Sequence, residues 1–163
     1  MEDKRITKTK CALKSALLDL LTTQAFDVIS ITELCKIANV SRITFYTHYK
    51  DKFALLDDIF NDMLIIGKEG YHRRQEENNP ENNLTQGYLN VLDSILSLYY
   101  ERYDFFQHVV PETNPYLAFR FYRILLDTVE SHTDKLKASY SLKYSARQIA
   151  GFICFGLFGF ISE

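Results

Sequence analysis

At 163 residues, with 47% hydrophobic and 25% charged side chains, the chain has the composition of a folded globular protein, which excludes extensive disorder. Its formal net charge of −2 is unevenly divided. Residues 1–52 hold nine basic and six acidic side chains, whereas residues 53–163 hold ten basic and fifteen acidic ones. A basic N-terminal third on an acidic remainder is the distribution expected of a protein that turns one surface toward nucleic-acid phosphates.

Apolar residues recur every three or four positions, and only six glycines and three prolines interrupt them. This periodicity predicts an all-α fold. The first helix is expected from about Thr7 to Thr22. A second helix begins after Ser30 or Thr32, and a third begins after Ser41, because these hydroxyl residues are good N-caps. Asn39 lies in the tight turn between them and tolerates the left-handed conformation. Two short helices around such a turn are typical of a helix-turn-helix DNA reader.

The third helix, from Arg42 to about Tyr49, has aromatic and hydroxyl side chains in place of a broad apolar face. Phe45 and Tyr49 are expected to point inward and anchor it. Arg42, Thr44 and Thr47 are expected to point outward to base edges, where arginine can bind guanine and a threonine methyl can contact thymine.

Side chains around that helix are expected to bind phosphates. Tyr46 and His48 lie toward its flanks, and Lys52 lies just past the following turn. Lys4, Arg5 and Lys8, in the basic start of the first helix, are either solvated charges or further phosphate contacts.

The rest of the chain reads as a series of longer helices. Asp51 is expected to cap a connector helix over residues 53–75, and the segment 76–83, EENNPENN, marks a break. A helix around Tyr88 to Tyr99 follows, then a short one in DFFQHVV. Asn114 before Pro115 marks the start of another helix, and the last begins near Ser145.

The last helix is apolar nearly all round and contains Gly151, Gly156 and Gly159. It is either a central core helix or a helix that contacts a second copy of the chain. The apolar run 149–161 is shorter than the ~20 residues that a membrane span needs. Because the sequence stops directly after this run, at Glu163, a further C-terminal helix is expected to be missing.

Several functional classes find no support in the residues. Cys11, Cys35 and Cys154 are scattered in apolar helical patterns, which favours buried free thiols in a reducing compartment. The histidines are too far apart in the sequence to suggest a zinc cluster. The sequence has no recognisable catalytic triad, paired carboxylates or Gly-rich phosphate loop, so we expect neither an enzyme nor a bound cofactor. The N-terminus lacks the apolar core of a signal peptide, and we expect a cytoplasmic protein.

The stretch from about Lys8 to Phe60 resembles the DNA-binding head of the TetR/AcrR transcriptional regulators. The shared pattern comprises Ala25-Phe26, Ile31-Thr32, Ala38-Asn39-Val40-Ser41, Thr44-Phe45-Tyr46, His48-Tyr49-Lys50-Asp51-Lys52 and Leu55-Leu56. Asn39 stands where the family usually has Gly, and Ile43 stands where it often has a small residue. The closing helix resembles, more weakly, the regulatory domain of a subset of the family.

The resemblance implies a helix-turn-helix head over residues 1–52 and a helical ligand-binding and dimerisation domain over residues 53–163. It also implies a homodimer on a palindromic operator, with the two reading helices about 34 Å apart. The DNA contacts that we expect are Lys8, Thr32, Ser41, Arg42, Thr44, Tyr46, Thr47, His48 and Lys52.

The resemblance further implies a small effector bound by the body, which is rich in aromatic residues. These residues form either an aromatic-packed core or a pocket for an apolar or aromatic effector. The pocket residues that we expect are Tyr99, Tyr103, Phe106, Phe121 and Phe155. Arg120 and Arg123 either pair with an anionic ligand or are solvated. The favoured function is a repressor released by its effector, and the alternative is a regulator that acts through a protein partner.

Overall fold

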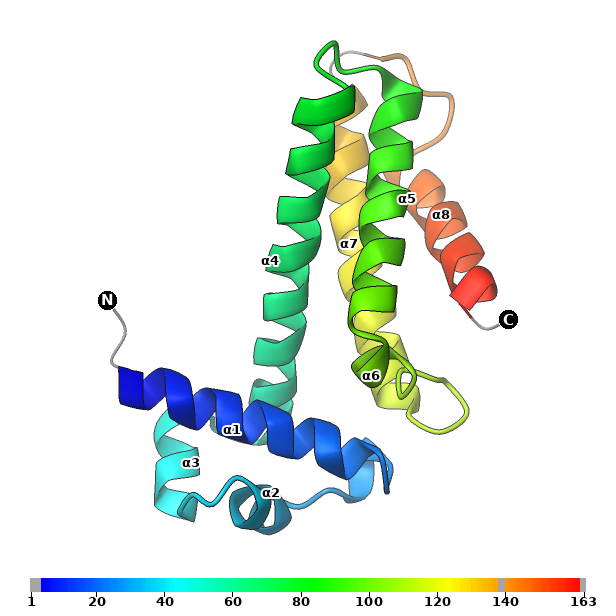
Figure 1. The fold of residues 1–163 in the computed structure, drawn as a ribbon. Coiled ribbons are helices and arrows are strands. Elements are labelled where there is room, and N and C mark those ends of the chain that lie inside the picture. The colour runs from blue at the N-terminus through cyan, green and yellow to red at the C-terminus, as the bar shows by residue number, and fades with distance from the viewer. Residues whose placement is uncertain (1–3, 138–139, 162–163) are drawn as a thin grey trace.

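The computed structural model describes residues 4–137 and 140–161 (Figure 1). In these ranges the chain forms eight α-helices and one short 3-10 helix, and it contains no strand. The predicted all-α fold is confirmed. The elements are α1 (Lys4–Leu21), η1 (Phe26–Val28), α2 (Ile31–Ile37), α3 (Arg42–His48), α4 (Lys52–Asn78), α5 (Leu84–Glu101), α6 (Tyr103–Phe106), α7 (Pro115–Lys137) and α8 (Ala146–Ile161).

Helices α1 to α3 lie together at one end of a bundle of longer helices, and α4 runs from that end along the bundle (Figure 1). We call residues 4–52 the head and the described residues from 53 onward the body. Helix α4 packs mainly on α5, and α8 packs on α7. The elongated arrangement places α2 and α3 at the extremity of the molecule that lies farthest from α8.

The ends of the head helices follow from their capping residues. Ser30 accepts a hydrogen bond from the backbone N–H of Glu33, whose carboxylate binds back to the N–H of Ser30 in a capping box. Ser41 and Asp51 cap α3 and α4 in the predicted way. Asn39 has φ of 53°, which confirms the left-handed turn between α2 and α3.

Two expectations, on the end of the connector helix and on the burial of Cys11, are corrected. Helix α4 continues to Asn78, into the segment predicted as a break, because Glu76 and Glu77 are good helix formers and the chain turns only at Asn79. Cys11 is exposed, whereas Cys35 and Cys154 are buried as expected. Burial raises the pKa of the Cys154 thiol to about 11.

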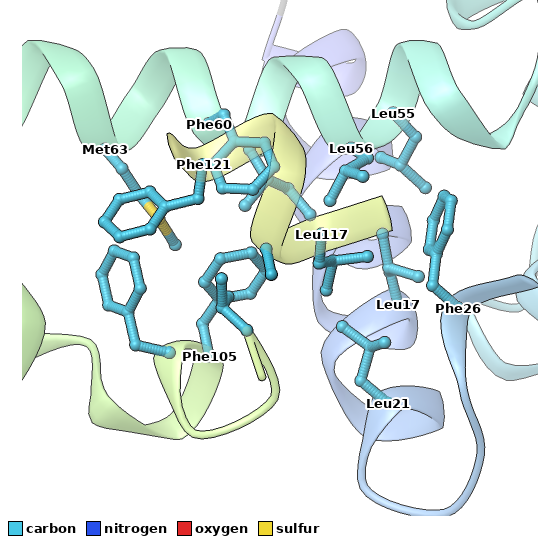
Figure 2. Packing of buried hydrophobic residues seen from close by; sticks show 14 of the residues in the cluster. Leu17, Leu21, Phe26, Leu55, Leu56, Phe60, Met63, Phe105, Leu117 and Phe121 are labelled. Carbon is cyan, nitrogen blue, oxygen red and sulfur yellow. The ribbon is translucent and has the colours of Figure 1, made fainter. Parts of the chain in front are cut away.

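The buried side chains of the head and body form one continuous apolar cluster. Figure 2 shows Leu17 of α1 and Phe26 of the η1 turn beside Leu117 of α7, with Leu56 of α4 above them. Farther along α4, the Phe60 ring meets the rings of Phe105 and Phe121 at centroid distances of 5.4 and 6.2 Å. The shared packing couples the position of the head to that of α4 and α7.

Candidate functional site

Helix α3, which we call the reading helix, is anchored on one side and open on the other. The Phe45 side chain is fully buried and that of Tyr49 is 5% exposed, so both predicted anchors are confirmed. Arg42 and Thr47 are exposed, and Tyr46 is 49% exposed. The reading helix therefore carries a free polar and aromatic surface at the extremity of the molecule (Figure 1).

The two threonines of the reading helix are partly committed to the helix itself. The hydroxyl of Thr44, which is half-buried, lies 2.8 Å from the hydroxyl of Ser41. The hydroxyl of Thr47 donates to the carbonyl oxygen of Ile43 at 2.9 Å. Thr47 thus has no hydroxyl proton left for a base, but its methyl group and an oxygen lone pair remain available.

Ile43 is the residue of this surface that we did not assign to a contact from the sequence. Its side chain is 81% exposed, the most exposed large apolar side chain of the head. The helical repeat places position 43 about 200° around the helix from Phe45, opposite the buried anchor. The inward position of Phe45 alone is therefore enough to place Ile43 on the outer face of the helix.

An internal polar network holds the end of the reading helix. The Tyr49 hydroxyl donates to the Asp58 carboxylate on α4 at 2.6 Å, and the Lys14 ammonium on α1 lies 3.1 Å from the same carboxylate oxygen. Burial, and then the Asp58 carboxylate, raise the pKa of Tyr49, so its phenol keeps its proton. Burial alone would raise the pKa of Asp58, but the bonds from Tyr49 and Lys14 outweigh it and lower the pKa. The three residues tie α1, α3 and α4 together.

Lys52 is engaged inside the head. Its ammonium donates to the carbonyl oxygens of Phe26, Asp27 and Ile29 at 2.9, 2.7 and 2.9 Å. It also lies 4.9 Å from the centre of the Phe26 ring. Because an ammonium has three N–H donors, these bonds use all of them. No observation tests the predicted contact of Lys52 with phosphate. Because these three bonds leave no N–H for a phosphate oxygen, we now expect Lys52 to hold the η1 turn and not to bind DNA.

The other residues expected to contact DNA lie on separate elements of the head. Thr32 is exposed in the first turn of α2, and Lys8 is exposed on α1. Ser41 is exposed at the start of the reading helix, and His48 is half-buried at its end. The head thus carries cationic and hydroxyl groups on the elements that flank the reading helix.

A cavity of about 580 Å³ lies in the body between α4, α5 and α7. Its wall includes Phe60, Met63, Leu98 and Leu125, and its volume is within the range of small-molecule sites. Of the five residues expected in a ligand pocket, only Phe121 lines it.

The other expected pocket residues lie elsewhere. Phe106 is buried against Phe121, with ring centroids 4.8 Å apart, and Tyr99 packs on Phe106 at 5.7 Å. Tyr103 is 52% exposed and Phe155 is 70% exposed. Tyr99 and Phe106 therefore belong to the aromatic packing near α6, and Tyr103 and Phe155 lie outside the cavity.

The two arginines considered for an anionic ligand are also placed. Arg120 forms an ion pair with Asp57 of α4. The guanidinium of Arg123 lies 6.0 Å from the centre of the Phe119 ring. Neither residue lines the cavity.

Helix α8 has one buried and one exposed apolar face. Ala146, Ala150, Cys154 and Leu157 are buried, whereas Phe152 is 82% exposed. A Cβ atom added at the glycines of α8 would meet no described atom within 4 Å. Within the described monomer, α8 is therefore not a central core helix.

Metal sites and membrane-spanning helices have no counterpart in the described ranges. These ranges contain no group of three or more His, Cys, Asp or Glu side chains placed to hold a metal ion. None of their helices combines the length and apolarity that crossing a membrane requires.

Comparison with known proteins gives relatives among transcription regulators. No protein-family model matches the chain. Over 58 residues, 36% of the chain, it is 40% identical to YxbF of Bacillus subtilis (strain 168), an uncharacterized HTH-type transcriptional regulator. That match covers 14% of YxbF, so the chain aligns with a small part of this curated relative.

A solved structure shares the fold over most of the chain. The dihydroxyacetone kinase operon activator DhaS matches with a TM-score of 0.53 and 24% sequence identity. The match covers 90% of this chain and 80% of that one. The helical head and body described here thus occur together in a known regulator.

Proposed function

We propose that this protein is a sequence-specific DNA-binding regulator of transcription of the TetR/AcrR type. The observation that carries the proposal is the reading helix, whose outer surface presents Arg42, Ile43, Tyr46 and Thr47 while Phe45 is fully buried beneath it. A rigidly anchored short helix with a free N-terminal half is what the major groove admits. The 58-residue similarity to an HTH-type regulator supports it.

The side chains divide into base contacts and phosphate contacts. Arg42 would bind guanine through O6 and N7, and the apolar side chain of Ile43 would pack on a thymine methyl group. Thr44 and Thr47 would approach neighbouring bases. The phosphate contacts that we propose are Lys8, Thr32, Ser41, Tyr46 and His48.

The active form is proposed to be a homodimer. The exposed Phe152 and Phe155 lie on the outer face of α8, and a second copy of the same face would cover them. Two heads related by a two-fold axis would read a palindromic operator with half-sites about 34 Å apart.

Regulation is proposed to pass through the body cavity. An apolar small molecule held between α4, α5 and α7 would shift α4 relative to α7 and so move the heads, which releases the operator. The alternative is a regulator whose body binds a protein partner and activates transcription; it shares the DNA step and differs in what the body recognises.

The DNA step is tested by selecting bound fragments from genomic or random DNA with the purified chain. The expected result is an inverted repeat, bound with an affinity that falls steeply as salt rises, because binding releases counterions. Thr44→Ala should change the preference between sequences by roughly 1 kcal/mol. Arg123→Ala, on the body, is the control and should leave both preference and affinity unchanged. Recovery of no common sequence, or salt-independent binding, would contradict the proposal.

A further inference from the structure

The polar groups of the body cavity are unevenly placed. Its inner wall is apolar: Phe60 and Met63 come from α4, Leu98 from α5, and Phe121 and Leu125 from α7. These side chains are buried, and their surfaces offer no hydrogen-bonding group to a ligand. The inner part of the cavity therefore suits the apolar body of a ligand.

Two hydroxyls on the wall have already used their protons. Ser94 donates to the carbonyl oxygen of Asn90 at 2.6 Å, and Thr128 donates to that of Ile124 at 2.7 Å. Neither hydroxyl can donate a hydrogen bond to an anionic group without losing its backbone bond. An anionic group of the ligand would thus find no donor at these two hydroxyls. The buried Nε2 of His132, which also lines the cavity, has no hydrogen-bond partner among the described residues and stays available to a polar group of the ligand.

Positive charge is found at the rim between α4 and α7. Lys68 of α4 and Lys135 of α7 line the cavity, are exposed, and form no ion pair with any described residue. Tyr71 also lines the cavity, and burial raises the pKa of its phenol, which therefore keeps its proton. These groups approach the cavity from two different helices.

The acidic residue of the lining, Asp127, is already paired. Its carboxylate lies 3.4 Å from the guanidinium of Arg147 on α8, and the same guanidinium binds Glu130 at 2.6 Å. This pairing partly neutralises Asp127 and leaves the two lysines as the uncompensated charges of the lining.

We propose that the cavity binds amphiphilic carboxylates, with the apolar body of the ligand on the inner wall and its carboxylate between Lys68 and Lys135 at the rim. This inference rests on the proposed effector role of the cavity and specifies the chemical class of the effector. A neutral ligand of the same shape would gain only the apolar contacts, and a cationic one would be repelled by both lysines.

Three probes with one apolar body separate these possibilities: 4-butylbenzoate, 4-butylbenzamide and 4-butylbenzylammonium. Each is titrated calorimetrically into the purified full chain without DNA, at neutral pH and at two salt concentrations. We expect the carboxylate to bind about tenfold more tightly than the amide at low salt, as two partly exposed ion pairs would give, and the ammonium to bind most weakly. The advantage of the carboxylate should shrink at high salt.

The double variant Lys68→Gln/Lys135→Gln locates the site. It should bring the affinity of the carboxylate down to that of the amide and leave the amide unaffected. The control Lys36→Gln/Lys50→Gln removes two charges from the head, changes the net charge equally, and should leave the order of the probes intact. Equal affinity of carboxylate and amide, tighter binding of the ammonium, or no binding of any probe at millimolar concentration overturns the proposal.

Operator release is measured separately, by adding 4-butylbenzoate to the complex of the chain with its selected DNA. Binding of the carboxylate without release of DNA would leave the ligand class intact and overturn the effector role. Specific DNA binding by a chain that binds none of the probes would leave the proposed DNA-binding function intact and overturn the ligand class.

Discussion

The side-chain oxygen of Asn114 accepts a hydrogen bond of 2.7 Å from the backbone N–H of Phe26. The two residues are 88 positions apart in the sequence, and both are buried. The Phe26 ring also stacks on that of Tyr116, with centroids 5.6 Å apart and planes 9° apart. Because Asn114 directly precedes α7, which lines the cavity farther along, this bond fixes the η1 turn of the head to the helix that a ligand would touch.

Replacing Asn114 with Leu should destabilise the protein. Leucine keeps the approximate volume but leaves the buried N–H of Phe26 without a partner, which costs about 1 to 3 kcal/mol. The free energy of unfolding is measured by urea titration. Asn61→Leu, at an exposed position of α4, is the matched control and should change it by less than about 0.5 kcal/mol. Equal effects of the two substitutions would show that the bond contributes nothing.

Lys52→Met separates an internal role from a phosphate contact. The substitution removes three bonds to the η1 turn and should lower the free energy of unfolding by about 1 to 3 kcal/mol. It should leave the salt dependence of DNA binding unchanged. Lys8→Met, in contrast, should reduce the slope of the logarithm of the binding constant against the logarithm of the salt concentration by about one per head. Lys50→Met, an exposed neighbour, is the control for stability. A reduced slope for Lys52→Met, with stability unchanged, would assign its ammonium to phosphate instead.

The network around Asp58 predicts a loss of stability in acid. Its folded pKa lies below the ordinary value of 3.8, because the bonds from Tyr49 and Lys14 outweigh burial. The unfolded state therefore binds more protons between the two pKa values, and stability falls with falling pH. The contribution of Asp58 is fully present above about pH 4 to 5 and is lost as the pH falls through the folded pKa.

Asp58→Asn should accordingly cost about 1 kcal/mol at pH 7 and make the unfolding free energy less steep between pH 5 and about pH 2.5. Urea titrations across this range test both effects. The exposed Asp93→Asn on α5 is the control and should retain the steepness of the unaltered chain. A parallel loss at every pH would mean that the carboxylate of Asp58 is not held in its charged form by the network.

The sequence predicts the features of this protein that depend on local chemistry. Ser41 and Asp51 cap helices because their side chains reach N–H groups three residues away, and Asn39 adopts positive φ for steric reasons of its own. Phe45 faces inward because helical periodicity allows little else. Such features need no knowledge of distant residues.

The features that were not predicted depend on contacts between distant segments. The ammonium of Lys52 is used by carbonyls 23 to 26 positions earlier, and the Asn114 oxygen is used by Phe26. The cavity likewise depends on how α4, α5 and α7 diverge. Of the aromatic residues expected to line it, only Phe121 does so. Side-chain type alone cannot separate an aromatic residue that lines a cavity from one that fills a core.

Ile43→Ala should relax the sequence preference of the reading helix. If the 81% exposed side chain of Ile43 packs on a thymine methyl group, its loss should reduce discrimination at one base pair of each half-site by about 1 kcal/mol. Binding to random DNA and the free energy of unfolding should not change, because the side chain has few contacts within the protein. Competition assays with single-base variants of the selected operator measure the effect. Undiminished discrimination at every position would exclude Ile43 from the base contacts.

Phe152→Glu tests whether α8 forms the interface between two copies of the chain. The side chain is 82% exposed, so the substitution should leave the monomer folded, as circular dichroism would show. In a two-fold symmetric interface each substitution occurs twice, and an aromatic anchor costs about 2 kcal/mol or more per copy when it is lost. Sedimentation equilibrium should therefore show a dimer dissociation constant raised by about 10³. Binding to the palindromic operator should weaken in parallel, because the two heads no longer bind it as one unit. Tyr100→Glu, 65% exposed on α5, adds the same charge away from α8 and should leave the dimer intact. Dissociation by Tyr100→Glu but not by Phe152→Glu would move the interface from α8 to α5.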